Sequence, residues 1–276
     1  MNTTLARLQV LQRQTGAQPT RTAATAPRSA ARTLPAGVAQ LRALLRLREV
    51  PTVAHRANAA DRVLPGTEIA PGLYLTCARV PGDPLPTLLD GTFDRRSFID
   101  PQRVLFFDTE TTGLAGGTGT RAFMIGAARW RDGALEVRQL TITTLAAERA
   151  MLAEFARWLE PTTILASYNG KSYDAPLLRT RYRLARMADP TTGLEHVDLL
   201  YPSRRRWRGV YENCRLCTIE RRVLGVVRED DLPGSDAPAA WLTYLHGGSA
   251  RNLCRVAAHN RQDVVSLARL LLHLAA

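Results

Sequence analysis

The sequence predicts an α/β fold in which helices cover a mixed β-sheet. Three consecutive segments of strand type lie between residues 104 and 142. A helical segment and a further strand follow them, which gives the element order βββαβ, and the chain ends in a long amphipathic helix. Packed layers of helix and sheet are the arrangement that buries the apolar faces of such elements.

The three strands are identified by short apolar runs and a turn signal. Val104 to Phe107 is a run of the kind found in buried strands, and it ends at Asp108. The segments 122–130 and 134–142 also resemble strands, and Arg131-Asp132-Gly133 between them is typical of a hairpin turn. A β-hairpin is therefore expected at this turn.

The remaining elements alternate between helix and strand. Apolar residues recur at helical spacing from Met151 to Leu159, ahead of Pro161, and Ile164 to Ser167 is strand-like. Beyond them a strand is expected at 195–200, and helices are expected at 174–187, 216–224, 239–245 and 250–274.

Three regions of different composition indicate the domain organisation. Residues 1–60 are poor in bulky apolar side chains and are expected to form a flexible basic arm with a short helix from Leu41 to Arg48. Residues 61–100 are a Pro/Gly-rich lead-in or a small β extension, in which only Leu73 to Val80 resembles a strand. Residues 101–276 carry the regular pattern of the α/β domain.

The chain is basic, and the excess charge is concentrated at its N-terminus. The formal net charge is +12, and residues 1–48 hold eight arginines and no acidic residue, so 12 minus 8 leaves +4 for the rest. Such an arm can contact a polyanion such as nucleic acid, or it can remain a solvated tail. An N-terminus rich in Arg, Ala and Thr and poor in acidic residues is also compatible with a transit peptide.

Composition excludes or disfavours several classes of protein. No stretch approaches the roughly 18 apolar residues of a membrane span, so an integral membrane role is excluded. The four cysteines are too few and too scattered for a disulfide scaffold in a chain of 276 residues, which favours a reducing compartment. A cytoplasmic bacterial protein is therefore expected.

Two carboxylates follow the first apolar strand at a spacing of two. The side chains of Asp108 and Glu110 lie on one face, because side chains alternate along a strand. Converging anions beside a buried strand repel each other and need a cation, and hard oxygen ligands favour Mg²⁺ or Mn²⁺. The alternative is that both residues begin a solvated loop.

Two more carboxylates occur next to or within predicted helices. Asp174 follows a strand and opens a helix, whereas Asp263 lies inside the otherwise apolar C-terminal helix. His259 precedes Asp263 by four residues, so both lie on the same helical face. Taken alone, Asp263 is typical of the polar stripe of a surface helix. Taken as a set, the four carboxylates predict a metal site.

These residues stand in motifs that resemble the DEDD (DnaQ-like) superfamily of 3′ to 5′ exonucleases. Six segments are similar to the bacterial YprB-like ribonuclease-H-like family: FFDTETTGLAGGTGT at 106–120, YNGKSYDAPLL at 168–178, HVDLL at 196–200, NCRLCTIE at 213–220, LGVVREDDLPG at 224–234 and HNRQDVVSL at 259–267. The resemblance implies a ribonuclease-H-like mixed sheet flanked by helices. Composition adds a basic, disordered N-terminal arm in front of it.

The resemblance also implies roles for the residues at its motif positions. Asp108, Glu110, Asp174 and Asp263 would bind two ions, Mg²⁺ or Mn²⁺, and His259 would be the general base. Hydrolysis would release nucleoside 5′-monophosphates from a 3′ end. His259 stands one residue closer to the last aspartate than is usual in histidine-containing members, and one residue rotates a helical side chain by about 100°.

Seven further residues are candidates for contact with nucleic acid, namely Thr111, Leu114, Asn169, Lys171, Arg205, Arg206 and Trp207. By the resemblance, the first two would contact the terminal sugar and base, and Lys171 could meet a phosphate. Residues 201–208 interleave a tryptophan with arginines, which suits phosphate contacts and base stacking. The alternative is a charged helix face with a tryptophan anchor. Asp198 is left outside the metal set, and it is expected either to support the ligands from behind or to be structural.

The resulting hypothesis is a metal-dependent exonuclease that acts on DNA or RNA, with a single-stranded 3′ end as its expected partner. Two alternatives stay open: a non-catalytic nucleic-acid-binding module of the same fold, and a structure-selective endonuclease. A protein that only binds nucleic acid gains nothing by placing four anions where phosphates must lie, which favours the enzyme.

Overall fold

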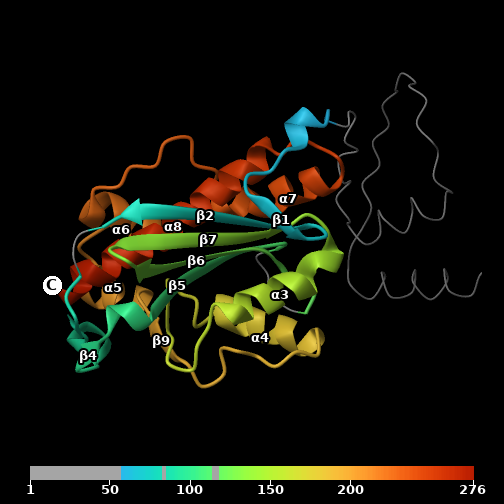
Figure 1. Ribbon diagram of the computed structural model, residues 1–276. Coiled ribbons are helices and arrows are strands. Elements are labelled where there is room, and N and C mark those ends of the chain that lie inside the picture. Colours follow the sequence, from blue (N-terminus) through green and yellow to red (C-terminus); the bar gives the residue numbers. More distant parts are fainter. Residues whose placement is uncertain (1–56, 83–84, 114–117) are drawn as a thin grey trace, which may run out of the picture. The chain divides into compact units, whose positions relative to one another are not determined.

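The computed structural model describes residues 57–82, 85–113 and 118–276, and within these ranges the strands form one large sheet and one small one (Figure 1). The large sheet has the strand order β1-β2-β7-β6-β5-β8-β9. Its strands are β1 (Thr67–Ala70), β2 (Leu73–Pro81), β5 (Val104–Thr111), β6 (Ala122–Arg131), β7 (Ala134–Ile142), β8 (Ile164–Ser167) and β9 (Glu195–Asp198). The small sheet pairs β3 (Leu89–Asp90) with β4 (Phe98–Ile99).

The sheet is mixed, as predicted, and β5 lies between its antiparallel part and its parallel part. Strand β5 pairs antiparallel with β6 and parallel with β8, and β8 pairs parallel with β9. The predicted hairpin between β6 and β7 is present, and Asp132 and Gly133 both have positive φ, at 50° and 70°. A two-residue loop with this backbone matches the twist of the strands that it joins.

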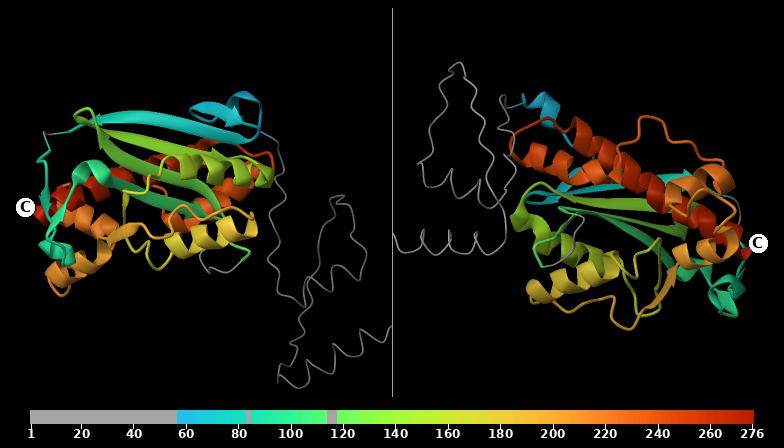
Figure 2. Two further views of the ribbon diagram at one scale, coloured as in Figure 1. Left: turned by 60° about the horizontal axis from the view of Figure 1, so that its bottom comes forward. Right: turned by 180° about the vertical axis from the view of Figure 1, so that it is seen from behind.

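Helices cover both faces of the sheet, as the views from two sides show (Figure 2). They are α3 (Glu148–Arg157), α4 (Asp174–Leu184), α5 (Leu200–Trp207), α6 (Leu216–Ile219), α7 (Ala237–Leu245) and α8 (Arg251–Ala275), and the π-helical turn η5 (Glu220–Leu224) extends α6. Helix α8 packs on β5 and β6, whereas α3 packs on β6 and β7. The predicted α/β fold with helices flanking a mixed sheet is confirmed.

Because side chains alternate along β5, this strand contributes apolar residues to the core on both faces of the sheet. Phe106 packs with Val264 and Leu267 of α8, whereas Phe107 packs with Phe155 of α3 and with α4. Both phenylalanines are almost fully buried, at 0% and 1% exposure. A strand that is apolar on both faces belongs in the middle of a covered sheet, and this fixes where its polar C-terminal end emerges.

A buried ion pair fixes α4 against α3. Arg181 Nε and Nη2 donate to Glu148 Oε1 and Oε2 at 2.6 and 2.8 Å, and both residues are buried. Arg121 Nη1 adds a third contact with the same carboxylate at 2.5 Å. Because two parallel contacts constrain both position and angle, they fix α4 relative to α3.

The segment 61–100, expected as a lead-in or a small β extension, adds β1 and β2 to one edge of the large sheet. The predicted strand at 73–80 corresponds to β2, and the helix predicted at 174–187 ends at Leu184. The N-terminal arm and its short helix lie outside the described residues, as does Leu114. Among the described residues, no helix combines the length and the apolar character that a membrane span needs.

Candidate active site

The four predicted carboxylates come together where β5 ends. Asp108 and Glu110 project from β5, Asp174 is the first residue of α4, and Asp263 comes from α8. Burial raises the pKa of Asp108 well above its ordinary value, and the negative charges of Asp263, Asp174 and Glu110 raise it further. Burial, Asp263 and Asp174 likewise raise the pKa of Glu110. The four groups therefore share one electrostatic environment.

The alternation of β5 explains how two helices reach this cluster. Asp108 continues the face of Phe106, which α8 covers, whereas Thr109 continues the face of Phe107, which α4 covers. The Thr109 hydroxyl donates a hydrogen bond to Asp174 Oδ1. Burial raises the pKa of Asp174 to about 6, although the Thr109 hydrogen bond favours the ionised form.

Asn260 of α8 holds the Asp108 carboxylate in place. Its Nδ2 lies 2.9 Å from Asp108 Oδ2 and its Oδ1 accepts a hydrogen bond from Gln139 Nε2 at 2.9 Å. Asn260 is fully buried, so this network is its only source of hydrogen bonds among the described residues. Sequence reasoning missed Asn260, although a polar residue three positions before Asp263 on the same helix was a usable signal.

Gly126 makes room for that asparagine. It pairs with Asp108 across the sheet, and a Cβ at this position would lie 2.0 Å from Asn260 Oδ1 and 2.8 Å from its Cγ. Contacts this short force a neighbour to move. Only glycine therefore allows α8 to bring Asn260 onto Asp108.

Substituting Gly126→Ala is expected to lower the free energy of unfolding by about 1–3 kcal/mol, the usual cost of overpacking a buried site. The new methyl group displaces Asn260 and thereby releases the Asp108 carboxylate. Urea unfolding monitored by circular dichroism measures the loss. Ala128→Gly, two residues along the same buried strand, provides a comparison in which volume is removed. Unchanged stability in Gly126→Ala would contradict the close packing described above.

Arg228 connects α8 with the turn η5. Its Nε and Nη2 donate to Glu220 at 2.7 and 2.6 Å, and Nη2 also donates to Asp263 Oδ1. Burial disfavours the charge of Arg228, but the hydrogen bonds to Glu220 and Asp263 raise its pKa above the ordinary value. Burial raises the pKa of Asp263, while Arg228 and His259 oppose that rise. Arg228 thus supplies positive charge beside the carboxylates.

His259 lies beside Asp263 despite its unusual spacing. Its Nδ1 is 2.7 Å from Asp231 Oδ1, and its Nε2 is 3.6 Å from Asp263 Oδ2. Arg228 Nη1 is a second neighbour of Nδ1, at 3.1 Å. A proton on Nδ1 would donate to the Asp231 carboxylate, whereas an unprotonated Nδ1 would accept from Arg228. In the tautomer with the proton on Nδ1, the lone pair of Nε2 faces the carboxylate cluster.

The donor set fits a hard divalent cation in its chemistry. Four carboxylates with raised pKa values gain most from a cation that takes oxygen ligands, as Mg²⁺ and Mn²⁺ do. Within the described ranges, however, no three His, Cys, Asp or Glu side chains are arranged closely enough to hold an ion. Arg228 pairs with Asp263 and Thr109 pairs with Asp174, so ligation by all four requires side chains to change partners.

Asp198 shapes the loop that leads to Asp174. It is fully buried, and its carboxylate accepts hydrogen bonds from the backbone N–H groups of Asn169, Lys171 and Leu200 at 2.7, 3.1 and 3.1 Å. Asn169 has a φ of 67°, a conformation that asparagine tolerates better than most residues. Asp198 therefore positions the candidate residues Asn169 and Lys171 next to the start of α4, and Lys171 is exposed there.

The other candidates for nucleic-acid contact lie in two places. Thr111 ends β5 beside the carboxylates, and its hydroxyl donates to the Gly113 carbonyl at 2.8 Å. Arg205 and Arg206 are exposed on α5. Trp207, expected to stack on a base, is only 7% exposed and packs against Tyr211 and His273. Because its indole ring belongs to the core, Trp207 anchors α5 and offers no stacking face.

Solved structures of nucleic-acid enzymes show limited similarity to this chain. The family B DNA polymerase of the archaeon Pyrobaculum calidifontis has a TM-score of 0.49 and 18% identity, over 64% of this chain and 25% of the polymerase. Exonuclease I of E. coli, in complex with a dT13 oligonucleotide, has a TM-score of 0.38 and 17% identity, over 54% of this chain and 42% of the exonuclease.

Sequence similarity is more extensive. The uncharacterized protein YprB of Bacillus subtilis (strain 168) is 36% identical over 172 residues, which are 62% of this chain and 41% of YprB. The chain thus spans about two fifths of the length of that relative. The family model of the RNase H superfamily matches residues 105–275, well over half of the 276 residues. This chain therefore belongs to the RNase H superfamily.

Proposed function

We propose that this protein is a metal-dependent 3′ to 5′ exonuclease that hydrolyses phosphodiester bonds of DNA or RNA and releases nucleoside 5′-monophosphates. The observation that carries the proposal is the convergence of Asp108, Glu110, Asp174 and Asp263, all with raised pKa values, beside the Nε2 atom of His259. Membership of the RNase H superfamily supports it. The 3′ to 5′ direction follows from the resemblance of the carboxylate motifs.

Divalent cations held by the four carboxylates would lower the pKa of a water molecule and offset negative charge on the scissile phosphate. The residues of the chain account for the rest. His259 Nε2 would accept the proton of the attacking water in the tautomer whose Nδ1–H donates to Asp231. Thr111, at the end of β5, and Lys171, exposed before α4, would contact the terminal nucleotide and a phosphate.

The proposal is tested with 5′-labelled single strands of DNA and RNA in Mg²⁺ or Mn²⁺. A ladder that shortens from the 3′ end, disappears in chelator and leaves a circular single strand intact is the expected result. Internal cuts in the circle would move the protein to the endonuclease class. Absence of cleavage in both polymers, together with salt-sensitive binding, would identify a non-catalytic binding module.

Substituting Asp231→Ala is expected to lower the rate of hydrolysis about 10- to 100-fold, the usual effect of removing the partner that orients a functional histidine. Asp231→Asn should retain more activity, because its amide oxygen still accepts from His259 Nδ1–H. Rates are measured with saturating oligonucleotide. Asp230→Ala is the matched control, since Asp230 is 77% exposed and pairs with Arg255.

A double variant separates this orienting role from a general structural one. If Asp231 acts through His259, Asp231→Ala combined with His259→Ala should lose no more activity than His259→Ala alone. Additive losses would show that Asp231 affects the reaction by another route. Equal losses in Asp230→Ala and Asp231→Ala would also contradict the assignment.

A further inference from the structure

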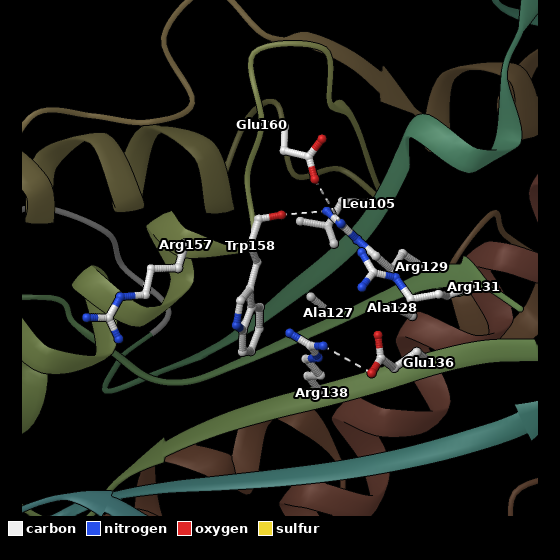
Figure 3. Close-up of a pocket in the computed structure, with 10 residues that line it drawn as sticks. All are labelled: Leu105, Ala127, Ala128, Arg129, Arg131, Glu136, Arg138, Arg157, Trp158 and Glu160. Carbon is white, nitrogen blue, oxygen red and sulfur yellow. Dashed lines mark hydrogen bonds and ion pairs between the residues drawn. The ribbon is translucent and has the colours of Figure 1, made fainter.

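A cluster of arginines lies on the sheet face that α3 covers. Arg129 and Arg131 project from β6 and Arg138 projects from β7, and Arg129 and Arg138 contact Trp158 at the end of α3. Together with Glu136 and Glu160 they surround a hollow of about 180 Å³, the arginine pocket (Figure 3). Arg157 also borders the hollow but points away from it.

The arginine pocket is separate from the carboxylates. Gly126 pairs with Asp108 and lies under Asn260, on the face that α8 covers. Arg129 and Arg131 follow Gly126 by three and five residues, so their side chains lie on the opposite face. At about 3.4 Å per residue, they also lie roughly 10 and 17 Å further along the strand. A ligand in the pocket would not touch the catalytic groups.

Positive charge in the arginine pocket is incompletely balanced. Arg138 pairs with Glu136 at 3.0 Å, but Arg129 is 3.6 Å from Glu160, whose side chain is 65% exposed. Among the described residues, Arg131 forms no ion pair. Burial lowers the pKa of Arg129, and the charges of Arg131 and Arg138 lower it further, although Glu160 opposes them. An anion placed among the three guanidinium groups would relieve this repulsion.

Two of the guanidinium groups are already held in place. Arg129 Nη2 donates to the carbonyl oxygen of Trp158, and the Arg138 guanidinium lies 5.9 Å from the centre of the Trp158 ring. Held in this way, they lose little conformational entropy when a ligand binds. Forked N–H donors match the oxygens of phosphate, and a hollow of this size is too small for a nucleoside.

We propose that Arg129, Arg131 and Arg138 form a second nucleic-acid contact, which binds a backbone phosphate of the strand outside the catalytic site. This inference rests on the proposed function, because that function supplies the strand. The pocket would add affinity for long substrates and would leave the chemistry at the carboxylates unchanged.

The test compares oligonucleotide binding by the wild type and by Arg131→Gln/Arg138→Gln over a range of salt concentrations, with chelator present to prevent turnover. The double variant is expected to bind about tenfold more weakly at low salt, with a logarithmic salt slope shallower by about 0.7 to 0.9, the value for one phosphate. Arg131→Glu is a second variant at an exposed position without an ion pair, and it should weaken binding in the same direction. Arg251→Gln, at the exposed start of α8, is the matched control.

Hydrolysis of a dinucleotide distinguishes this proposal from the proposed function. A dinucleotide is too short to span both sites, so the double variant should hydrolyse it at the wild-type rate. Unchanged oligonucleotide binding in both pocket variants, or an equal loss in Arg251→Gln, would overturn the second contact while hydrolysis stands. If the wild type binds strands through the arginine pocket but hydrolyses none of them, the proposed exonuclease function is wrong, and the proposal of a nucleic-acid contact at the pocket stands.

Competition with inorganic phosphate, at constant ionic strength, shows whether the arginine pocket binds the phosphate of a strand or a free anion. Oligonucleotide bound through the pocket should resist millimolar phosphate, because a strand also contacts the protein elsewhere. Phosphate that binds the wild type but not the double variant, with oligonucleotide affinity equal in both, would assign the pocket to a free anion and overturn the proposal for a strand.

Discussion

Asp108→Asn is expected to lower phosphodiester hydrolysis by at least about 10³-fold. The substitution removes one negative charge from the carboxylate cluster and so weakens cation binding, and metal-ion catalysis contributes several kcal/mol to transition-state stabilisation. Single-turnover hydrolysis of a labelled strand at saturating Mg²⁺ measures the effect. A residual rate within tenfold of the wild type would exclude Asp108 from the catalytic metal site.

The loss in Asp108→Asn should not reflect misfolding. An asparagine side chain keeps an oxygen that accepts from Asn260 Nδ2, so the contact with α8 survives. The circular dichroism spectrum and the cooperativity of unfolding should therefore match those of the wild type. Asp230→Asn, an equal change of charge at an exposed position, is expected to retain full activity.

Asp174→Asn is expected to stabilise the metal-free protein increasingly as pH rises from about 4 to about 6. The pKa of Asp174 is raised to about 6 in the folded protein, so its ionised form opposes folding above that pH. The destabilisation of the wild type by ionised Asp174 is absent below the ordinary pKa of an aspartate and complete above pH 6. Because one pKa unit corresponds to about 1.4 kcal/mol, the difference approaches roughly 3 kcal/mol at pH 8.

The comparison must be made between wild type and variant at each pH. Burial lowers the pKa of His196 to about 4, which reduces stability at acid pH, but this contribution is the same in both proteins. Urea unfolding in chelator measures the difference. Mg²⁺ at pH 8 should stabilise the wild type more than Asp174→Asn, because the cation offsets a charge that the variant lacks. A difference that does not depend on pH would contradict the desolvation of the partly buried Asp174 carboxylate.

Much of the fold follows from local pattern. Strands β5, β6 and β7 were predictable because apolar runs and the Asp132-Gly133 turn are short-range signals. Strand β1 was not, because three of its four residues are exposed and give no apolar pattern. The end of α4 at Leu184, earlier than expected, coincides with the left-handed backbone of Arg186, whose φ of 53° is not signalled by the residue type.

The candidate site was predictable only in part. The four carboxylates are marked by the strands and helices that carry them, but the roles of Asn260 and Arg228 depend on contacts across 152 and 35 residues of sequence. Asp231 was likewise hidden, because its partner His259 lies 28 residues away. Composition suggested Trp207 as a stacking platform, and only the packing of α5 against α8 shows that its ring is buried.

The large sheet ends in a short strand at each edge, in the part of the chain that the structure describes. β1 and β9 have four residues each, and the neighbouring β2 has nine. Unpaired backbone groups on long, flat edges promote strand addition between molecules, and short edge strands limit it. The protein should therefore resist edge-to-edge aggregation when it is concentrated, and β2, which β1 covers along only a third of its length, is the strand on which that resistance depends.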